Sequence, residues 1–231
     1  MACYILTLFF SIRVSICNIL KNKLQPTMNS SQQIVNHLML KSIEISDISL
    51  YHGKMGIVLA LYIYSQQSAQ EHIKDYAWDL LQEIYKGVNE TQPVGLEYGL
   101  SGIGYGTTLL KKYGIFDCDL NEVLCSIDQK IMAYDPLRIT DFTFRTGAWG
   151  LSSYIRLRMN VEGKISSFDT QYLHVLRYVL SANQALYNGI PEKTIWADLQ
   201  APDWELSDFR NHPLGIDKGL AYYLVNNLNL H

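Results

Sequence analysis

The chain contains few cysteines, and none stands in a pattern that marks a disulfide framework or a structural zinc site. Its 231 residues include four, and no two form a Cys-x-x-Cys pair or adjoin a histidine. The cysteines are Cys3, Cys17, Cys118 and Cys125. Small disulfide-stapled proteins are far richer in cysteine, and structural zinc sites use closely spaced pairs. The cysteine usage therefore predicts a reduced, cytoplasmic protein with no metal site recognisable from its sequence.

The chain also lacks an excess of positive charge. Its 19 lysines and arginines are outnumbered by 22 acidic residues, which gives a formal net charge of −3. The basic residues are scattered among acidic ones and form no stripe. A nucleic-acid-binding domain needs a basic patch that tracks the phosphates. We therefore expect no nucleic-acid partner.

No hydrophobic run in the chain is long enough to be a clear membrane span. The apolar run at residues 3–12 is ten residues long and is followed by Arg13. A membrane-spanning helix needs about 20 apolar residues, and an arginine near its centre is unfavourable. We predict that residues 1–27 form an apolar N-terminal extension outside a folded domain at 28–231. Membrane contact through residues 1–20 is the alternative.

A repeated glycine motif is the main feature that the chain does contain. Residues 50–56, 96–102 and 144–150 share the frame apolar-x-x-Gly-x-x-Gly, and residues 216–222 keep only its first glycine. The motif glycines are Gly53, Gly56, Gly99, Gly102, Gly147, Gly150 and Gly219. The first glycines are 46, 48 and 72 residues apart, and an apolar, helix-like run follows each motif. Such a period predicts a stacked array of helical units.

The segments between the glycine motifs have the periodicity of amphipathic helices. Apolar residues recur three and four positions apart in residues 69–88, 119–131 and 170–182, and after a possible cap at Ser30. No segment alternates like a strand for more than about five residues, the usual strand length. We therefore predict an all-α fold of helical hairpins with the glycine turns at one end. One glycine of each turn is expected to need positive φ, and another to avoid a steric clash.

The repeated motif resembles that of the lanthionine synthetase C-like (LanC-like) family, most clearly at residues 49–57 and 95–104. The resemblance covers roughly residues 30–226 as an array with a period near 47, as helical-repeat proteins have. It implies an α/α toroid, here an incomplete ring, with the glycine loops at one end. It also implies a precursor peptide as the partner, and zinc held by two cysteines and a histidine.

The chain departs from the family pattern at the zinc ligands. Family members carry a Trp-Cys pair in one glycine loop and a Cys-His-Gly triplet in another, and this chain has neither. Cys118 and Cys125 flank the predicted helix start at Asp119, and we interpret them as partly buried thiols. The sequence therefore predicts no metal ligands and no evident cofactor.

Five polar residues at the glycine turns are the candidates for a functional site. His52 precedes the first glycine of its motif, as a histidine does in the family's active site, and is the candidate for proton transfer. Four further residues are candidates for peptide binding: Glu97, Tyr98, Arg145 and His212. For His52, a hydrogen bond to the loop backbone is the alternative. For the whole group, the alternative is a solvated rim.

These observations lead to a functional hypothesis with two alternatives. The hypothesis is a LanC-like protein that binds a precursor peptide or a partner enzyme and has no zinc-dependent cyclase site of its own. One alternative is an active thioether-forming cyclase with an unusual site, or one shared across a dimer. The other is a carbohydrate-active toroid, which needs paired carboxylates. Asp128, Asp135 and Asp141 were considered for that role, and we interpret them as solvated or capping residues.

Overall fold

The computed structural model describes residues 26–89, 91–163, 167–186 and 193–226, which contain helices and turns but no strand. The helices are α2 (Pro26–Ser42), α3 (Lys54–Ser68), α4 (Glu71–Gly87), α5 (Leu100–Lys112), α6 (Leu120–Val123), α7 (Cys125–Met132), α8 (Ala148–Glu162), α9 (Thr170–Ala182), α10 (Ile195–Asp198) and α11 (Tyr222–Asn226). Three 3₁₀ turns complete the set: η1 (Pro136–Arg138), η2 (Gln184–Leu186) and η3 (Leu206–Asn211). The prediction of an all-α fold is confirmed.

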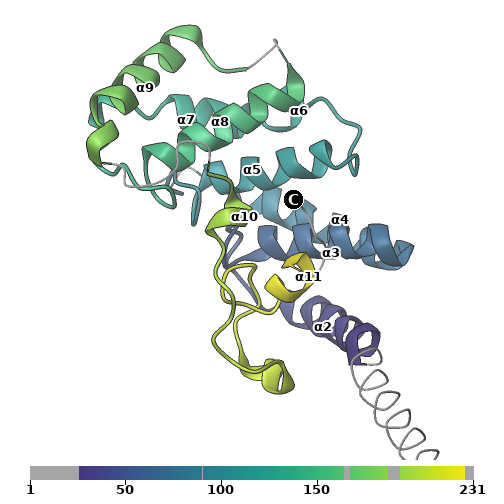
Figure 1. The fold of residues 1–231 in the computed structure, drawn as a ribbon. Helices are drawn as coiled ribbons and strands as arrows, with labels where there is room; N and C mark the ends of the chain where they lie inside the picture. Colours follow the sequence, from purple (N-terminus) through teal and green to yellow (C-terminus); the bar gives the residue numbers. More distant parts are fainter. Residues whose placement is uncertain (1–25, 90, 164–166, 187–192, 227–231) are drawn as a thin grey trace, which may run out of the picture.

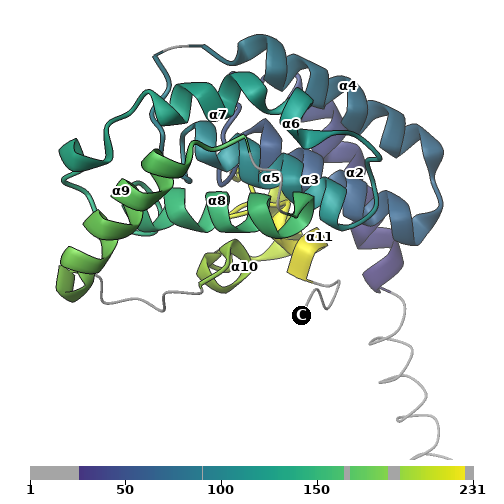
Figure 2. The same ribbon diagram turned by 90° about the horizontal axis from the view of Figure 1, so that it is seen from above.

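Three inner helices, α3, α5 and α8, lie side by side in the middle of the molecule (Figure 2). Helix α3 packs on α5, and α5 packs on α8. Helices α4 and α7 cover one side of this layer, and α10 and α11 lie on the other. Because the inner layer is covered on both sides, every residue from Leu100 to Leu110 in α5 is buried. An inner helix can therefore be apolar nearly all round.

The predicted amphipathic helices are present, with two corrections. Helix α9 has the predicted bounds, and α4 buries one face as its periodicity indicated. Helix α2 begins at Pro26, so Ser30 lies inside the helix and does not cap it. The segment at 119–131 is broken at Leu124 into α6 and α7, although the Asp119 side chain accepts the predicted capping hydrogen bond from the Asn121 N–H.

In the first three motifs, the first glycine lies immediately before an inner helix in extended backbone. Gly53, Gly99 and Gly147 have φ values of −104°, −123° and −111°. No motif glycine has a positive φ, so the expectation that one glycine of each turn needs it is wrong. A Cβ on each would clash with a backbone oxygen of its own loop, contributed in turn by Asp47, Pro93 and Asp141. Glycine is required at these positions because a side chain would clash with the backbone, and not because the backbone has a left-handed conformation.

The same backbone oxygens anchor the start of each inner helix. The N–H groups of Lys54, Leu100 and Ala148 donate to the oxygens of Asp47, Pro93 and Asp141 at 2.8, 2.9 and 2.9 Å. The Leu220 N–H donates in the same way to the Pro213 oxygen at 2.8 Å. All four motifs therefore share this anchoring hydrogen bond, and we call them glycine loops 1 to 4 in chain order. Loop 4 differs at the residue before its glycine, because Lys218 has a positive φ of 54°.

The second glycine of the motif lets the inner helix approach the start of its own loop. A Cβ on Gly56, Gly102 or Gly150 would clash with the carbonyl oxygen of the apolar residue six positions earlier. Glycine loop 4 has Tyr222 at this position, and α11 begins only at that residue. The missing glycine thus coincides with a later helix start.

The three aspartates considered for carbohydrate chemistry have separate structural roles. Asp135 and Asp141 accept hydrogen bonds from nearby backbone N–H groups, as capping residues do. Asp128 is fully buried, so the interpretation of it as solvated is wrong. It accepts hydrogen bonds from the Tyr154 and Ser167 hydroxyls and faces Arg158 at 3.7 Å. Burial raises the pKa of Asp128, although these donors oppose the shift.

Within the described residues, no helix is both long enough and apolar enough to cross a membrane. Most of the predicted N-terminal extension, residues 1–25, lies outside the described part of the chain. Its separation from the repeat domain stays a prediction, as does the incomplete ring.

The loop geometry makes Gly150 sensitive to a single methyl group. We expect Gly150→Ala to lower the free energy of unfolding by about 1–3 kcal/mol, because the new Cβ overlaps the Phe144 carbonyl oxygen. Gly87→Ala is the matched control, since its Cβ would meet only Ile48 side-chain carbons, at 3.4–3.5 Å. Urea denaturation measures both. Equal stability of the two variants would contradict this account of the loops.

Candidate functional site

One position of each glycine loop points its side chain toward a common point. The apolar residue that opens each motif is buried: Leu50, Leu96, Phe144 and Ile216. The residues that directly follow these are Tyr51, Glu97, Arg145 and Asp217. These four residues contact one another at the centre of the candidate site. Together with Asp198, we call them the Arg145 cluster.

Arg145 contacts every other member of the cluster. Its NH1 and NH2 groups donate to the two carboxylate oxygens of Asp217 at 2.7 and 3.1 Å, and NH1 also donates to Glu97 Oε1 at 3.2 Å. Its Nε donates to Asp198 Oδ2 at 2.8 Å. The guanidinium carbon lies 4.7 Å from the centre of the Tyr51 ring. One side chain thus joins three glycine loops and α10 to its own loop.

Backbone hydrogen bonds place the loops beside one another. The Arg145 carbonyl oxygen accepts from the N–H groups of Leu96 and Glu97 at 2.8 and 2.7 Å. The Tyr51 carbonyl oxygen accepts from the Asp217 N–H at 3.1 Å. Glycine loop 2 therefore lies against loop 3, and loop 4 lies against loop 1. The chain returns to its first repeat through the fourth motif.

Helix α10 contributes Asp198 to the cluster. The Tyr51 hydroxyl donates to Asp198 Oδ2 at 3.0 Å, and Lys193 pairs with Oδ1. Ile195 on the same short helix is fully buried, and the Trp196 indole N–H donates to the Tyr113 hydroxyl at 3.1 Å. These contacts hold α10 against the inner helices.

The cluster is largely buried, and its charges are paired. Burial opposes ionisation of Asp217, but hydrogen bonds from Arg145 and from the Gln200 N–H outweigh it and lower the pKa below 3.8. Burial likewise disfavours the charged form of Arg145, yet its carboxylate partners raise its pKa. Burial and Asp198 raise the pKa of Tyr51, which therefore stays a neutral donor. Arg145 and Asp217 therefore form a charged pair, beside which Tyr51 contributes a neutral hydroxyl group.

His52 and Tyr98 form the exposed edge of this cluster. His52 Nε2 lies 2.9 Å from Glu97 Oε1. The His52 and Tyr98 rings stack with their centroids 5.3 Å apart. The His52 side chain is 32% exposed, and Tyr98 is 52% exposed. A ligand at the glycine loops can therefore reach an imidazole whose orientation is set by a carboxylate, beside an accessible phenol ring.

The structure brings together four of the five residues predicted for the site. His52, Glu97, Tyr98 and Arg145 are neighbours, as their places in the glycine turns predicted. His212 instead stacks on Trp204 with ring centroids 4.2 Å apart, and it makes no hydrogen bond to the cluster among the described residues. It follows Asn211, the last residue of η3, so its position before the fourth motif did not place it at the loop end.

Sequence reasoning missed Tyr51, Asp198 and Asp217. The motif itself carried the signal for two of them, because Tyr51 and Asp217 occupy the same motif position as Glu97 and Arg145. Aligning the four motifs by their first glycine would have found both. Asp198 lies outside every motif, so no local pattern pointed to it.

Comparison with known proteins agrees with the repeat architecture. The model of the family described as "Lanthionine synthetase C-like protein" matches residues 21–199, which is more than half of the chain. The chain belongs to the lanthionine synthetase C-like family. No curated protein matches it. The family is an α/α toroid, and membership indicates a function of the lanthipeptide-modification type.

The described residues do not fit the zinc site of the LanC-like family. Cys118 lies beyond the C-terminal end of α5, whereas glycine loop 2 precedes its N-terminal end, and a 13-residue helix is about 20 Å long. Cys125 begins α7 and is exposed, which corrects the interpretation of it as partly buried. Cys3 and Cys17 lie outside the described residues. No described cysteine therefore joins a histidine at the glycine loops.

One group at the loops has the spacing of metal ligands. Ligand atoms of His52, Glu97 and Asp217 lie within 4.8 Å of one another. However, both carboxylates already bind the Arg145 guanidinium, which holds a positive charge at that place. A metal ion there would have to displace Arg145 or be repelled by it. We interpret the group as an ion-pair network.

The lowered pKa of Asp217 predicts how stability depends on pH. Its ionised form stabilises the fold above about pH 4, and this contribution is lost as the pH falls through the lowered pKa. The stability difference between the wild type and Asp217→Asn should therefore shrink as the pH falls from about 6 to about 3. Urea denaturation across this range measures the difference. A difference independent of pH would contradict the assigned ion pair.

Proposed function

We propose that this LanC-like protein binds a precursor peptide or a partner enzyme of a lanthipeptide-type pathway at its glycine-loop end, without a zinc-dependent cyclase site of its own. Family membership supports the type of pathway. The exposed His52–Tyr98 edge beside the Arg145 cluster supports the place of binding. The position of Cys118 and Cys125, away from the glycine loops, supports the lack of a zinc site.

The geometry of the cluster suits binding because its polar groups are held in place before a ligand arrives. Arg145 fixes Glu97, and Glu97 in turn orients the His52 ring. A preorganised site loses less side-chain freedom when a peptide binds. Tyr98 adds an exposed aromatic ring, a residue type that often contributes strongly to protein interfaces. This combination of a rigid polar floor and an aromatic edge is the observation that carries the proposal.

The charge state of the cluster argues against the carbohydrate-active alternative. A glycosidase needs one carboxyl group with a raised pKa that acts as an acid. The three carboxylates at the loops share Arg145 as a partner, and the pKa of Asp217 is lowered. Asp217 is therefore not the carboxylic acid with a raised pKa that this reaction needs.

The His52–Glu97 pair favours a second candidate function, a thioether-forming peptide cyclase that works without zinc. An imidazole oriented by a carboxylate can act as a general base. His52 would take the proton of a peptide cysteine while the sulfur forms a bond to the β-carbon of a dehydrated residue. The electron pair of the C=C bond would move to the α-carbon, which then takes up a proton. No oxidant or reductant is needed.

Binding and turnover of one peptide distinguish these functions. The probe is a dehydrated precursor peptide with free cysteines. We expect Tyr98→Ala to weaken its binding by roughly 5- to 30-fold, as loss of an interface aromatic does. Tyr134→Ala, also an exposed tyrosine, should leave binding unchanged. Calorimetry measures affinity, and metal analysis of the purified protein should find zinc far below one ion per chain.

Three results of these measurements would overturn the proposal. Stoichiometric, tightly bound zinc would show that the protein has a metal site. Consumption of the peptide thiols by the wild type, abolished in His52→Ala, would establish the cyclase function in place of binding alone. Equal affinity of wild type and Tyr98→Ala would move peptide binding away from the glycine loops.

A further inference from the structure

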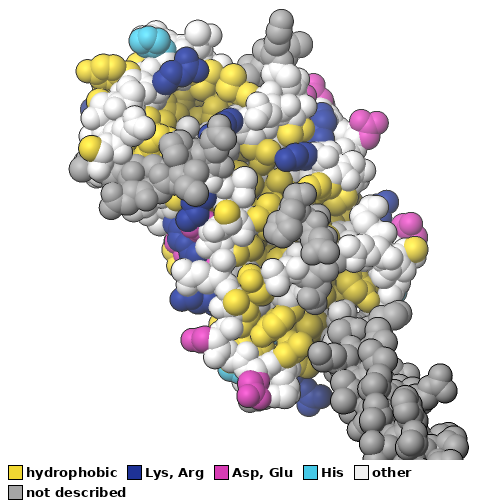
Figure 3. Space-filling model, viewed as in Figure 1, with side chains coloured by type: hydrophobic (Ala, Val, Ile, Leu, Met, Phe, Trp, Pro, Cys, Tyr) yellow, Lys and Arg dark blue, Asp and Glu magenta, His cyan; other side chains and the backbone are white. Residues whose placement is uncertain are grey.

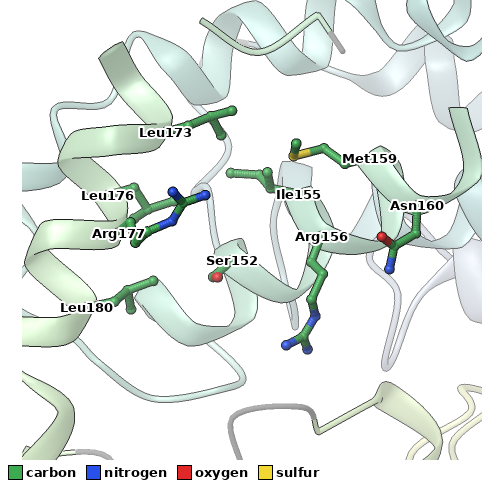
Figure 4. A pocket seen from close by; sticks show the side chains of 9 residues that line it. All are labelled: Ser152, Ile155, Arg156, Met159, Asn160, Leu173, Leu176, Arg177 and Leu180. Carbon is green, nitrogen blue, oxygen red and sulfur yellow. The ribbon is translucent and has the colours of Figure 1, made fainter. Parts of the chain in front are cut away.

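A groove lies between α8 and α9, separate from the glycine loops. It has a volume of about 320 Å³ and is lined by Ser152, Ile155, Arg156, Met159, Asn160, Leu173, Leu176, Arg177 and Leu180. Figure 4 shows these side chains on the two helices that border the space. On each helix they recur three and four positions apart, so each helix contributes one stripe. The two stripes together form a mainly apolar trough.

The place of α8 in the helical array explains why the groove is open. Helix α5 has an inner helix on each side, namely α3 and α8. Among the described helices, α8 packs on α5 and on its own hairpin partner α9, and α11 packs on α3 and α2 instead. Within the described part of the chain, no further inner helix packs on α8 beyond α5, so the groove presents apolar residues at this end of the array.

The charged residues among those that the structure describes around the groove are both arginines. The described lining includes Arg156 and Arg177 but no aspartate or glutamate. Arg177 is exposed and forms no ion pair with another described residue. On the face shown in Figure 3, hydrophobic side chains lie between α8 and α9 with cationic side chains beside them. An occupant that suits this groove is apolar on one side and carries carboxylates at the edges of that side.

We propose that the α8–α9 groove binds an amphipathic helix of another protein, with apolar residues along one face and aspartate or glutamate beside them. A helix binds to an apolar groove through its own side chains at positions i, i+3, i+4 and i+7, which lie together on one face of that helix. Carboxylates on the helix pair with the exposed Arg177. This surface is independent of the binding role proposed for the glycine loops.

Binding of two designed peptides tests the proposal. One is a 15-residue helical peptide with leucines at positions i, i+3, i+4 and i+7 and glutamates beside them, and the other has lysine in place of each glutamate. Fluorescence anisotropy should show binding of the acidic peptide alone. Arg177→Glu should weaken this binding about tenfold, because attraction becomes repulsion. Lys86→Glu, the same charge change on α4, is the matched control and should leave it unchanged.

A second variant tests the apolar part of the groove. Leu173→Glu places a carboxylate among the lining side chains and should abolish binding of the acidic peptide. A cooperative thermal unfolding transition of each variant is the control that it is folded. Equal binding of the two peptides, or no effect of either variant, would overturn the proposal. A dimer of the wild type that Arg177→Glu dissociates would also overturn it, because a second copy would then occupy the groove.

A loss of peptide binding at this groove is distinguishable from a failure of the proposed function. Tyr98→Ala leaves the groove intact and should bind the designed acidic peptide as the wild type does. Arg177→Glu leaves the glycine loops intact and should keep its affinity for a dehydrated precursor peptide that binds at those loops. Displacement of the acidic peptide by a fatty acid such as palmitate, without helix selectivity, would assign the groove to a small amphiphile and contradict the proposal.

Discussion

The guanidinium of Arg145 is the interaction on which the arrangement of the glycine loops depends. It contacts side chains from loops 1, 2 and 4 and from α10, and its own carbonyl oxygen holds the backbone of loop 2. Removing a partner from a buried ion pair is strongly destabilising, because the remaining charge is left without compensation. The positive charge of Arg145 offsets the repulsion among the three carboxylates, so they can lie close together. This arrangement of carboxylates places His52 and Tyr98 at the exposed edge of the Arg145 cluster.

The cluster follows from the repetition of one loop. Each motif buries its opening apolar residue, so the next residue is directed to the loop end in every repeat. The backbone of each loop is held by the hydrogen bond between the helix start and a carbonyl oxygen seven residues earlier. Because the four loops share this hydrogen bond and lie side by side, equivalent positions become neighbours. A phenol, two carboxylates and a guanidinium at these positions form a buried network, whereas four like charges would separate the loops.

The fold could be predicted from the sequence where the signal was local or repeated. Periodicity located α4 and α9, and the spacing of glycines located the inner helices. Prediction failed where the outcome depended on crowding between backbone atoms. Gly53 has extended φ because a Cβ would clash within its loop, and propensity alone does not reveal such contacts. Asp128 was misread because its buried partners, Tyr154 and Arg158, come from α8, which is distant in sequence.

The candidate site was predictable to the extent that the motifs carried it. His52, Glu97, Tyr98 and Arg145 were found because each lies one or two residues before a motif glycine. Asp217 has the same register, and it was missed because the four motifs were not compared position by position. Asp198 and the displacement of His212 depend on the path of the chain between residues 193 and 213, which has little periodicity. Tertiary contacts alone decide such positions.

A double-mutant cycle between Arg145 and Asp217 tests most directly whether this guanidinium holds the loops together. The free energies of unfolding of the wild type, Arg145→Met, Asp217→Asn and the double variant are measured by urea denaturation at neutral pH. The bidentate contact at 2.7 and 3.1 Å predicts a coupling energy of about 1–3 kcal/mol, with Arg145→Met the most destabilising single change. Additive effects of the two substitutions would contradict the account, because the two residues would then not interact in the folded protein.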